Sequence, residues 1–163
     1  MRWMIASDIH GSAYYCRKMI EAYRREKADK LLLLGDILYH GPRNDLPKDY
    51  APKEVIAMLN EIKEEILCVK GNCESEVDQM VLEFPIMADY CILYLNDRMI
   101  FATHGHVHNL EHVPMLKRRH SSSWTYTCAG LQRTDRCIYM NPGSISIPKE
   151  DSLHSYMILD EKF

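Results

Sequence analysis

Short apolar runs alternate with stretches of helical periodicity along the first half of the chain. The runs at 3–7, 31–34 and 66–69 have the length of buried strands, and each leads into a polar motif. Apolar residues at helical spacing fill the intervals, over 13–27 and 53–65, and Ser12 precedes the first of these stretches as a potential cap. This alternation predicts an α/β fold.

Strand-like patterns predominate in the second half. Residues 90–95 and 99–103 are predicted to form a hairpin, and 138–140 and 156–159 are predicted to be late strands. The stretch 40–52 holds three prolines and a glycine, which favours an irregular loop. Because a hairpin and late strands add to the βα units, we expect the sheets to be mixed.

Length and composition indicate a single domain over residues 1–163. The net charge of −3 argues against a broad nucleic-acid surface, which would need clustered lysine and arginine. The six cysteines are scattered without metal-type spacing, which favours a reducing compartment. The N-terminus lacks the apolar stretch of a signal peptide or a membrane span, so we expect a cytoplasmic protein without a membrane partner. The oligomeric state is left open between a monomer and a homo-oligomer.

Four polar motifs follow predicted strands, and together they carry the candidate chemistry. Their side chains are carboxylates, imidazoles and an amide, which are the ligands that hard and borderline divalent metals accept. Each motif alone has an ordinary explanation as a turn, a capping pair or a helix cap. Their joint occurrence in this order favours a metal site. The candidate ligands are Asp8, His10, Asp36, Asn72 and His104.

The order Asp-x-His, Gly-Asp, Gly-Asn-Cys-Glu and Thr-His-Gly-His resembles the calcineurin-like metallophosphoesterases. Segments 35–44, 71–80 and 141–149 also resemble small bacterial phosphodiesterases of that group, and the likeness covers nearly the whole chain except about 118–136. The resemblance implies a four-layer sandwich, in which two mixed β-sheets are flanked by helices. It also implies two divalent metal ions, with manganese the expected metal, and a small phosphodiester substrate.

The resemblance assigns a role to each candidate ligand. Asp8 and His10 would bind one metal, Asn72 and His104 the other, and Asp36 would bridge the two. Cations about 3.5 to 4 Å apart can generate a nucleophile from water and offset charge during an in-line displacement. Asp36 is therefore expected to be catalytic as well as metal-binding.

Two further residues are expected to be catalytic. Many relatives carry histidine at the position of Cys73, where it can protonate the leaving group. A thiol is a poorer acid, so we expect a preference for substrates with good leaving groups; the alternative is that Cys73 is only a small packed residue. His106 shares the turn of His104 and is expected to line the site. Arg43 and Asn44 would contact substrate if their loop folds over the metals.

The family pattern needs one more motif, a Gly-His-x-His that supplies one imidazole to each metal, and it is missing from the stretch directly before the Asn-Pro-Gly turn at 141–143. Residues 118–136 read RRHSSSWTYTCAGLQRTDR instead. Back-translating 119–129 with permitted codons, and reading one nucleotide later, gives Asp-Ile-Leu-Leu-His-Gly-His-Thr-His-Val-Pro. We therefore hypothesise a local frameshift; the alternative is genuine divergence of a surface loop. Coding DNA that cannot yield His-Gly-His-Thr-His in the shifted frame would exclude the frameshift.

Loss of this motif also suggests an alternative interpretation of the chain's function. Each metal would lack one nitrogen ligand, so the chain could be a catalytically impaired or inactive copy that binds metal weakly, with a less stable sheet. Three serines in succession also fit a buried strand poorly. Replacement ligands would have to come from water or nearby side chains, among them His106, His108, His112 and His120. The domain is also expected to be shortened at its C-terminus. A third interpretation, an interaction subunit, would require a large exposed apolar patch.

Overall fold

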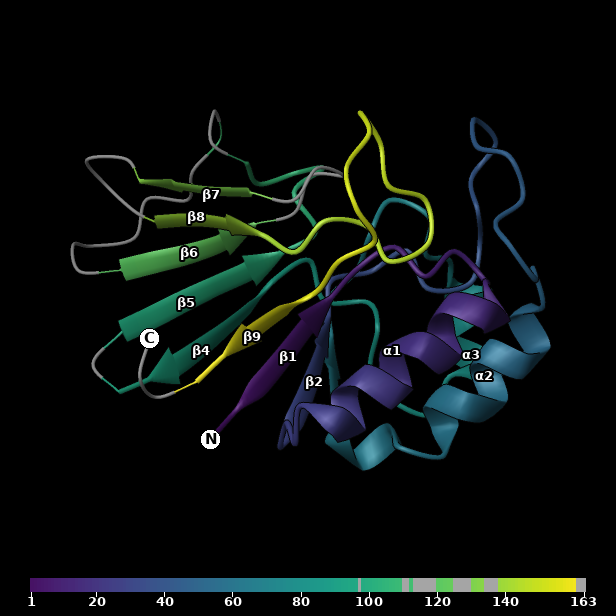
Figure 1. Ribbon diagram of the computed structural model, residues 1–163, viewed down its shortest axis with the longest axis horizontal. Coiled ribbons are helices and arrows are strands. Elements are labelled where there is room, and N and C mark those ends of the chain that lie inside the picture. Colours follow the sequence, from purple (N-terminus) through teal and green to yellow (C-terminus); the bar gives the residue numbers. More distant parts are fainter. Residues whose placement is uncertain (97, 110–111, 113–119, 125–129, 134–137, 161–163) are drawn as a thin grey trace.

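Two β-sheets pack face to face, and helices cover the outer face of the first of them (Figure 1). The structure is a computed structural model that describes residues 1–96, 98–109, 112, 120–124, 130–133 and 138–160. Both sheets contain parallel and antiparallel pairs, which confirms the predicted α/β fold with two mixed sheets.

The first sheet has the strand order β3-β2-β1-β9. Strands β1, β2 and β3 run parallel, as expected for strands joined by helices, whereas β9 pairs antiparallel with β1. All three N-terminal strands were predicted within a residue or so of their ends. The bounds are β1 (Trp3–Ala6), β2 (Lys30–Leu33), β3 (Ile66–Cys68) and β9 (Met157–Leu159).

The helices follow the predicted periodicity with one correction. The side chain of Ser12 accepts a hydrogen bond from the backbone N–H of Tyr15 (3.3 Å) and caps α1 as expected. The helix predicted over 53–65 ends at Asn60, whose side chain bonds the backbone of Val81, the last residue of α3, and of Glu83 shortly after it. None of the described helices is long and apolar enough to cross a membrane. The helices are α1 (Ala13–Arg25), α2 (Pro52–Asn60) and α3 (Glu76–Val81), with a 3-10 turn at Lys63–Glu65.

The second sheet has the order β4-β5-β6-β8-β7 and includes strands that the sequence did not predict. The hairpin of β4 and β5 is confirmed. Strand β6, however, falls in the 118–136 stretch and lies between β5 and β8, parallel to both. A position between two strands supplies hydrogen-bond partners on both sides, which overrides the low strand propensity of serine. The bounds are β4 (Cys91–Leu95), β5 (Arg98–Thr103), β6 (His120–Trp124), β7 (Gly130–Arg133) and β8 (Ile138–Asn141).

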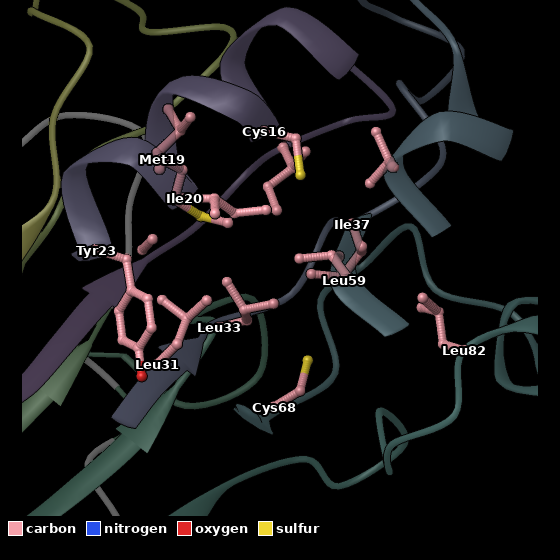
Figure 2. Close-up of a cluster of buried hydrophobic side chains, with 14 of the residues drawn as sticks. Cys16, Met19, Ile20, Tyr23, Leu31, Leu33, Ile37, Leu59, Cys68 and Leu82 are labelled. Carbon is pink, nitrogen blue, oxygen red and sulfur yellow. The ribbon is translucent and has the colours of Figure 1, made fainter. Parts of the chain in front are cut away.

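Two hydrophobic clusters fill the faces of the first sheet. Because side chains alternate along a strand, Met4 and Leu31 face the helices, while Ile5 and Leu32 face the second sheet. Figure 2 shows the helix-side cluster, in which side chains of α1 and α2 meet those of β2 and β3. Burial of both faces explains why the strands read as continuous apolar runs. The sheet is thus a rigid platform for the loops at its carboxyl ends.

Candidate functional site

The loops at the carboxyl ends of β1, β2, β3 and β5 meet in one pocket of about 230 Å³. Open α/β sheets place their ligand sites at this edge, and the side chains that the strand-then-motif pattern singled out gather there. All five candidate ligands line the pocket, as does His106. The lining residues are Asp8, His10, Asp36, Arg43, Asn44, Asn72, His104, Gly105, His106, Ile147 and Lys149.

Three of the candidate ligands have a left-handed backbone conformation that L-residues rarely adopt. The φ angles are 61° at Asp8, 49° at His10 and 56° at Asp36. Backbone hydrogen bonds between the two loops hold these conformations, from Asp8 N to Gly35 O (3.1 Å) and from His10 N to Asp36 O (2.9 Å). Such strain is concentrated at functional sites, where the surrounding structure over-determines it.

The loop after β8 supports Asp8 from the opposite side. The backbone N–H of Ile145 donates to Ser7 O (3.0 Å), and Ser146 donates to Asp8 O through both its backbone N–H (3.2 Å) and its hydroxyl (2.7 Å). His154 Nδ1 in turn donates to Ile145 O at 2.7 Å. The matched segment 141–149 is therefore a scaffold for the first ligand loop. Nothing in the local pattern of its sequence had indicated that role.

Both histidine ligands have their ring orientation fixed by a backbone carbonyl. Nδ1 of His10 donates to Tyr39 O, and Nδ1 of His104 donates to Leu34 O, each at 2.7 Å. In both rings Nε2 is thus the nitrogen on the pocket side, and it is the nitrogen that a neutral imidazole could offer to a metal ion. A carbonyl behind the ring is the usual arrangement for a metal-binding histidine.

Asp36 occupies the centre of the ligand set. Its Oδ2 lies 3.7 Å from His10 Nε2 and 3.7 Å from His104 Nε2. On one side, His10 Nε2 is 3.2 Å from Asp8 Oδ1; on the other, His104 Nε2 is 3.1 Å from Asn72 Oδ1. Asp36 thus lies between the Asp8–His10 pair and the Asn72–His104 pair, which we call the two half-sites; their division between two metals stays a prediction from the resemblance.

The charge balance of the pocket favours a bound cation. Asp8 and Asp36 are only 4% and 3% exposed, and neither forms an ion pair with a lysine or arginine in the part of the chain that the structure describes. Burial would raise the pKa of Asp8, but the hydrogen bond with His10 and the charge of His104 outweigh it, and the pKa is lowered. Burial likewise opposes protonation of His10, yet Asp8 raises its pKa. Buried carboxylates of this kind need a positive partner, and the donor atoms fit divalent metal ions.

Cys73 lies against the shared carboxylate. Its backbone N–H donates to Asp36 Oδ1 at 2.8 Å, and its Sγ accepts a hydrogen bond from Asn72 Nδ2 at 3.1 Å. The sulfur, His10 and Asp36 offer ligand atoms that lie within 4.8 Å of one another. Burial and then the negative charge of Asp36 raise the pKa of the Cys73 thiol to about 12, so the group is protonated at neutral pH.

Glu74 links the second and third ligand loops, a role that sequence reasoning missed. Its two carboxylate oxygens accept hydrogen bonds from the backbone N–H groups of Ile37 and Gly71. The loops approach so closely that a Cβ at Gly71 would lie 2.2 Å from Asp36 Oδ1. Burial and the charge of Asp36 raise the pKa of Glu74. In the sequence it stood out only as the last residue of the Gly-Asn-Cys-Glu motif, to which no role had been given.

We expect Glu74→Gln to weaken manganese binding by about 10- to 100-fold, as is typical when a partner that orients ligands is lost. The amide can accept only one of the two N–H bonds, so the free energy of unfolding should also fall by about 1–3 kcal/mol. Manganese titration followed by electron paramagnetic resonance measures the first effect. Glu76→Gln, an exposed neighbour, is the matched control, and equal affinities in the two variants would contradict the role of Glu74.

The other histidines proposed as replacement ligands have different surroundings. His106 is exposed, and its ring centroid lies 5.3 Å from that of His104; burial and the charge of His104 lower its pKa. His108 packs edge-on against Tyr90 and Phe101, and neither His108 nor His112 lines the pocket. The side chain at position 120 lies outside the described residues. Among the described residues, the ligand groups therefore contain none of these histidines.

Two cationic side chains line the pocket beside the ligands. Arg43 comes from the loop after β2, where Asn44 Nδ2 donates to His40 O at 2.7 Å, and Lys149 comes from the loop after β8. The condition set for substrate contact by the 43–44 loop is met in that both residues line the pocket, and the contact itself stays a prediction. Lys149 belongs to a segment that resembled the family but had been given no role.

Comparison with known proteins agrees with this geometry. The model of the calcineurin-like phosphoesterase superfamily domain matches residues 1–162. The phosphodiesterase YfcE of Escherichia coli K12 is 42% identical over 161 residues, covering 98% of this chain and 88% of the relative. The structure of E. coli YfcE, described as a phosphoesterase, superposes with a TM-score of 0.93 over the same shares of each chain. An archaeal phosphodiesterase, 21% identical, shares the fold with a TM-score of 0.65, covering 98% of this chain and all of that one.

Proposed function

Because this chain belongs to the calcineurin-like phosphoesterase superfamily, we propose that it hydrolyses small phosphodiesters at a centre of two divalent metal ions. The observation that carries the proposal is the position of Asp36, whose Oδ2 is equally distant, at 3.7 Å, from the two histidines of the separate half-sites. The name of the E. coli relative supports the diester as substrate class. A single catalytic domain over 1–163 and a cytoplasmic location are parts of the same proposal.

The ligand set divides between the two ions. Asp8, His10 and Asp36 would hold one, and Asp36, Asn72 and His104 the other. When bound, the ions would polarise the phosphoryl oxygens and make water a better nucleophile. We propose manganese as the metal, because oxygen and imidazole ligands suit it.

Other residues of the pocket would act on the substrate directly. Arg43 and Lys149 offer positive charge to the non-bridging phosphoryl oxygens from two different loops. His106, at the pocket rim, would hydrogen-bond the phosphoryl group. The protonated thiol of Cys73 is a weak acid, so its help to a departing alcohol would be small, and esters of acidic phenols should be hydrolysed fastest.

Hydrolysis of bis(4-nitrophenyl) phosphate tests the proposal. We expect the purified chain to release 4-nitrophenol in the presence of manganese, to lose this activity in excess chelator, and to regain it when manganese is added back. Magnesium and calcium at equal concentration control for a general effect of divalent ions. Release of 4-nitrophenol at the same rate in chelator would overturn a metal-dependent function.

A second candidate function is supported by the sequence of 118–136. Residues 118–136 hold no Gly-His-x-His, so each metal could lack one imidazole, and the protein could be an impaired copy that binds metal weakly. Strand β6 occupies the place between β5 and β8 with the sequence His-Ser-Ser-Ser-Trp. Residues 125–129 and 134–137 lie outside the described residues. The frameshift remains our proposal for the origin of the segment.

A further inference from the structure

A second hollow, of about 400 Å³, adjoins the candidate metal site. Its chemistry differs from that of the ligand pocket, where Ile147 is the only aliphatic side chain among the described lining residues. Here aliphatic and aromatic side chains predominate, and we call the hollow the tyrosine groove. It is lined by Leu38, Tyr39, Tyr50, Pro52, Ile56, Cys73, Ser75, Val77, Asp78 and Val81.

The tyrosine groove and the ligand pocket share a boundary at Cys73. The thiol lines the groove, while its sulfur offers a ligand atom within 4.8 Å of those of His10 and Asp36, which line the pocket. A Cβ on Gly41 would lie 3.3 Å from Cys73 Sγ and 3.5 Å from Asn44 Nδ2. Cys73, together with Gly41, thus separates the tyrosine groove from the ligand pocket.

The wall of the groove is ordered before any ligand binds. Tyr39 packs edge-on against His40 (ring centroids 4.9 Å apart), and His40 packs edge-on against Tyr50 (5.3 Å). The backbone of Tyr50 forms a β-bridge with Ser12 at the start of α1. A wall fixed in this way loses little conformational entropy when a flat group binds against it.

The outer rim exposes apolar surface that no described element covers. The exposed fractions are 42% for Tyr39, 66% for Val77 and 40% for Val81. The carboxylate that lines the groove, Asp78, accepts hydrogen bonds from the backbone N–H (2.8 Å) and hydroxyl (3.0 Å) of Ser75 as the capping box of α3. With this charge engaged in the cap, the groove suits an uncharged, apolar group.

We propose that the tyrosine groove binds an aryl or similarly flat apolar ester group of the phosphodiester whose phosphoryl group lies at Asp36. This inference rests on the proposed function and specifies its substrate class. A substituent that leaves the phosphorus on the Cys73 side passes directly into the groove. The enzyme would therefore favour diesters with one aromatic ester group over diesters with two small ones.

Binding of two phosphonates tests the groove without requiring turnover. Phenylphosphonate and methylphosphonate share the phosphoryl-like head and differ only in the group that would enter the groove. In calorimetric titrations of the manganese-loaded protein, we expect the phenyl compound to bind about tenfold more tightly, because burial of part of the ring removes apolar surface from water. The double variant Val77→Asn, Val81→Asn should reduce this ratio to about threefold or less.

Met80→Asn is the matched control, because Met80 belongs to the same helix, is 82% exposed and is absent from the groove lining. It should keep the wild-type ratio. An unchanged ratio in the double variant, or no binding of phenylphosphonate by the wild type, would overturn the groove proposal. So would a wild-type dimer that the double variant dissociates in sedimentation velocity, since a second copy would then cover the groove. Absence of hydrolysis with the ratios as expected would count against the proposed function alone.

Discussion

Asp36→Asn is expected to lower manganese-dependent hydrolysis of bis(4-nitrophenyl) phosphate by about a thousandfold, equivalent to about 4 kcal/mol of transition-state stabilisation. Asp36 belongs to both groups of potential ligands, so under the proposed function its loss would affect both ions rather than one. The neutral amide keeps an oxygen for the Cys73 backbone N–H, and asparagine tolerates the positive φ of 56°. The fold should therefore remain intact while the charge that holds the metals is removed.

Asp45→Asn is the matched control, because it makes the same chemical change at an exposed position of the loop after β2. It should leave turnover and manganese stoichiometry unchanged. Electron paramagnetic resonance should show that Asp36→Asn binds fewer manganese ions than the control. Full turnover in Asp36→Asn would mean that hydrolysis does not depend on the bridging carboxylate, and the dinuclear proposal would be wrong.

Replacing residues 119–129 by Asp-Ile-Leu-Leu-His-Gly-His-Thr-His-Val-Pro is expected to raise kcat/KM by at least about a hundredfold. By the family resemblance, the new segment would return one neutral nitrogen ligand to each metal. It would also place apolar residues in β6, beside a strand whose Ile100, Phe101 and Ala102 are buried. The midpoint of chemical unfolding should therefore rise together with the activity.

A second replacement separates these two effects. The same segment with alanine in place of its last two histidines keeps the apolar strand and removes the added ligands. It should recover the stability without the activity. If the original chain already matches the full replacement in kcat/KM and manganese affinity, the five ligands and water suffice, and the impaired-copy alternative is wrong.

The sequence predicted best those features that depend on neighbouring residues alone, such as apolar strands and helix caps. The apolar runs of β1, β2 and β3 are buried on both faces, so they read as strands without reference to the rest of the chain. Ser12 caps α1 through a contact that spans only a few residues. The ligand motifs could be placed because each follows a predicted strand, and parallel strands bring their carboxyl ends to one edge.

Sequence patterns could not predict features that depend on contacts with residues far away in the chain. The helix predicted over 53–65 stops at Asn60, and the side chain of that residue bonds the backbone of Val81 and Glu83, which lie 21 and 23 residues further along the chain. Strand β6 was not predicted, since serine-rich segments form strands only when neighbouring strands supply the hydrogen bonds. The C-terminal strand was predicted, but its antiparallel pairing with β1 was not.

The sequence by itself determined most of the strands and helices along the chain and the choice of candidate metal ligands, because both depend on periodicity and residue chemistry. Only the tertiary structure decided that Asp36 lies midway between His10 and His104, that Glu74 joins two loops, and that Cys73 divides a polar pocket from an apolar groove. These are relations between segments separated by more than 30 residues in most cases. Packing of the sheets sets such distances, and no local pattern in the sequence encodes them.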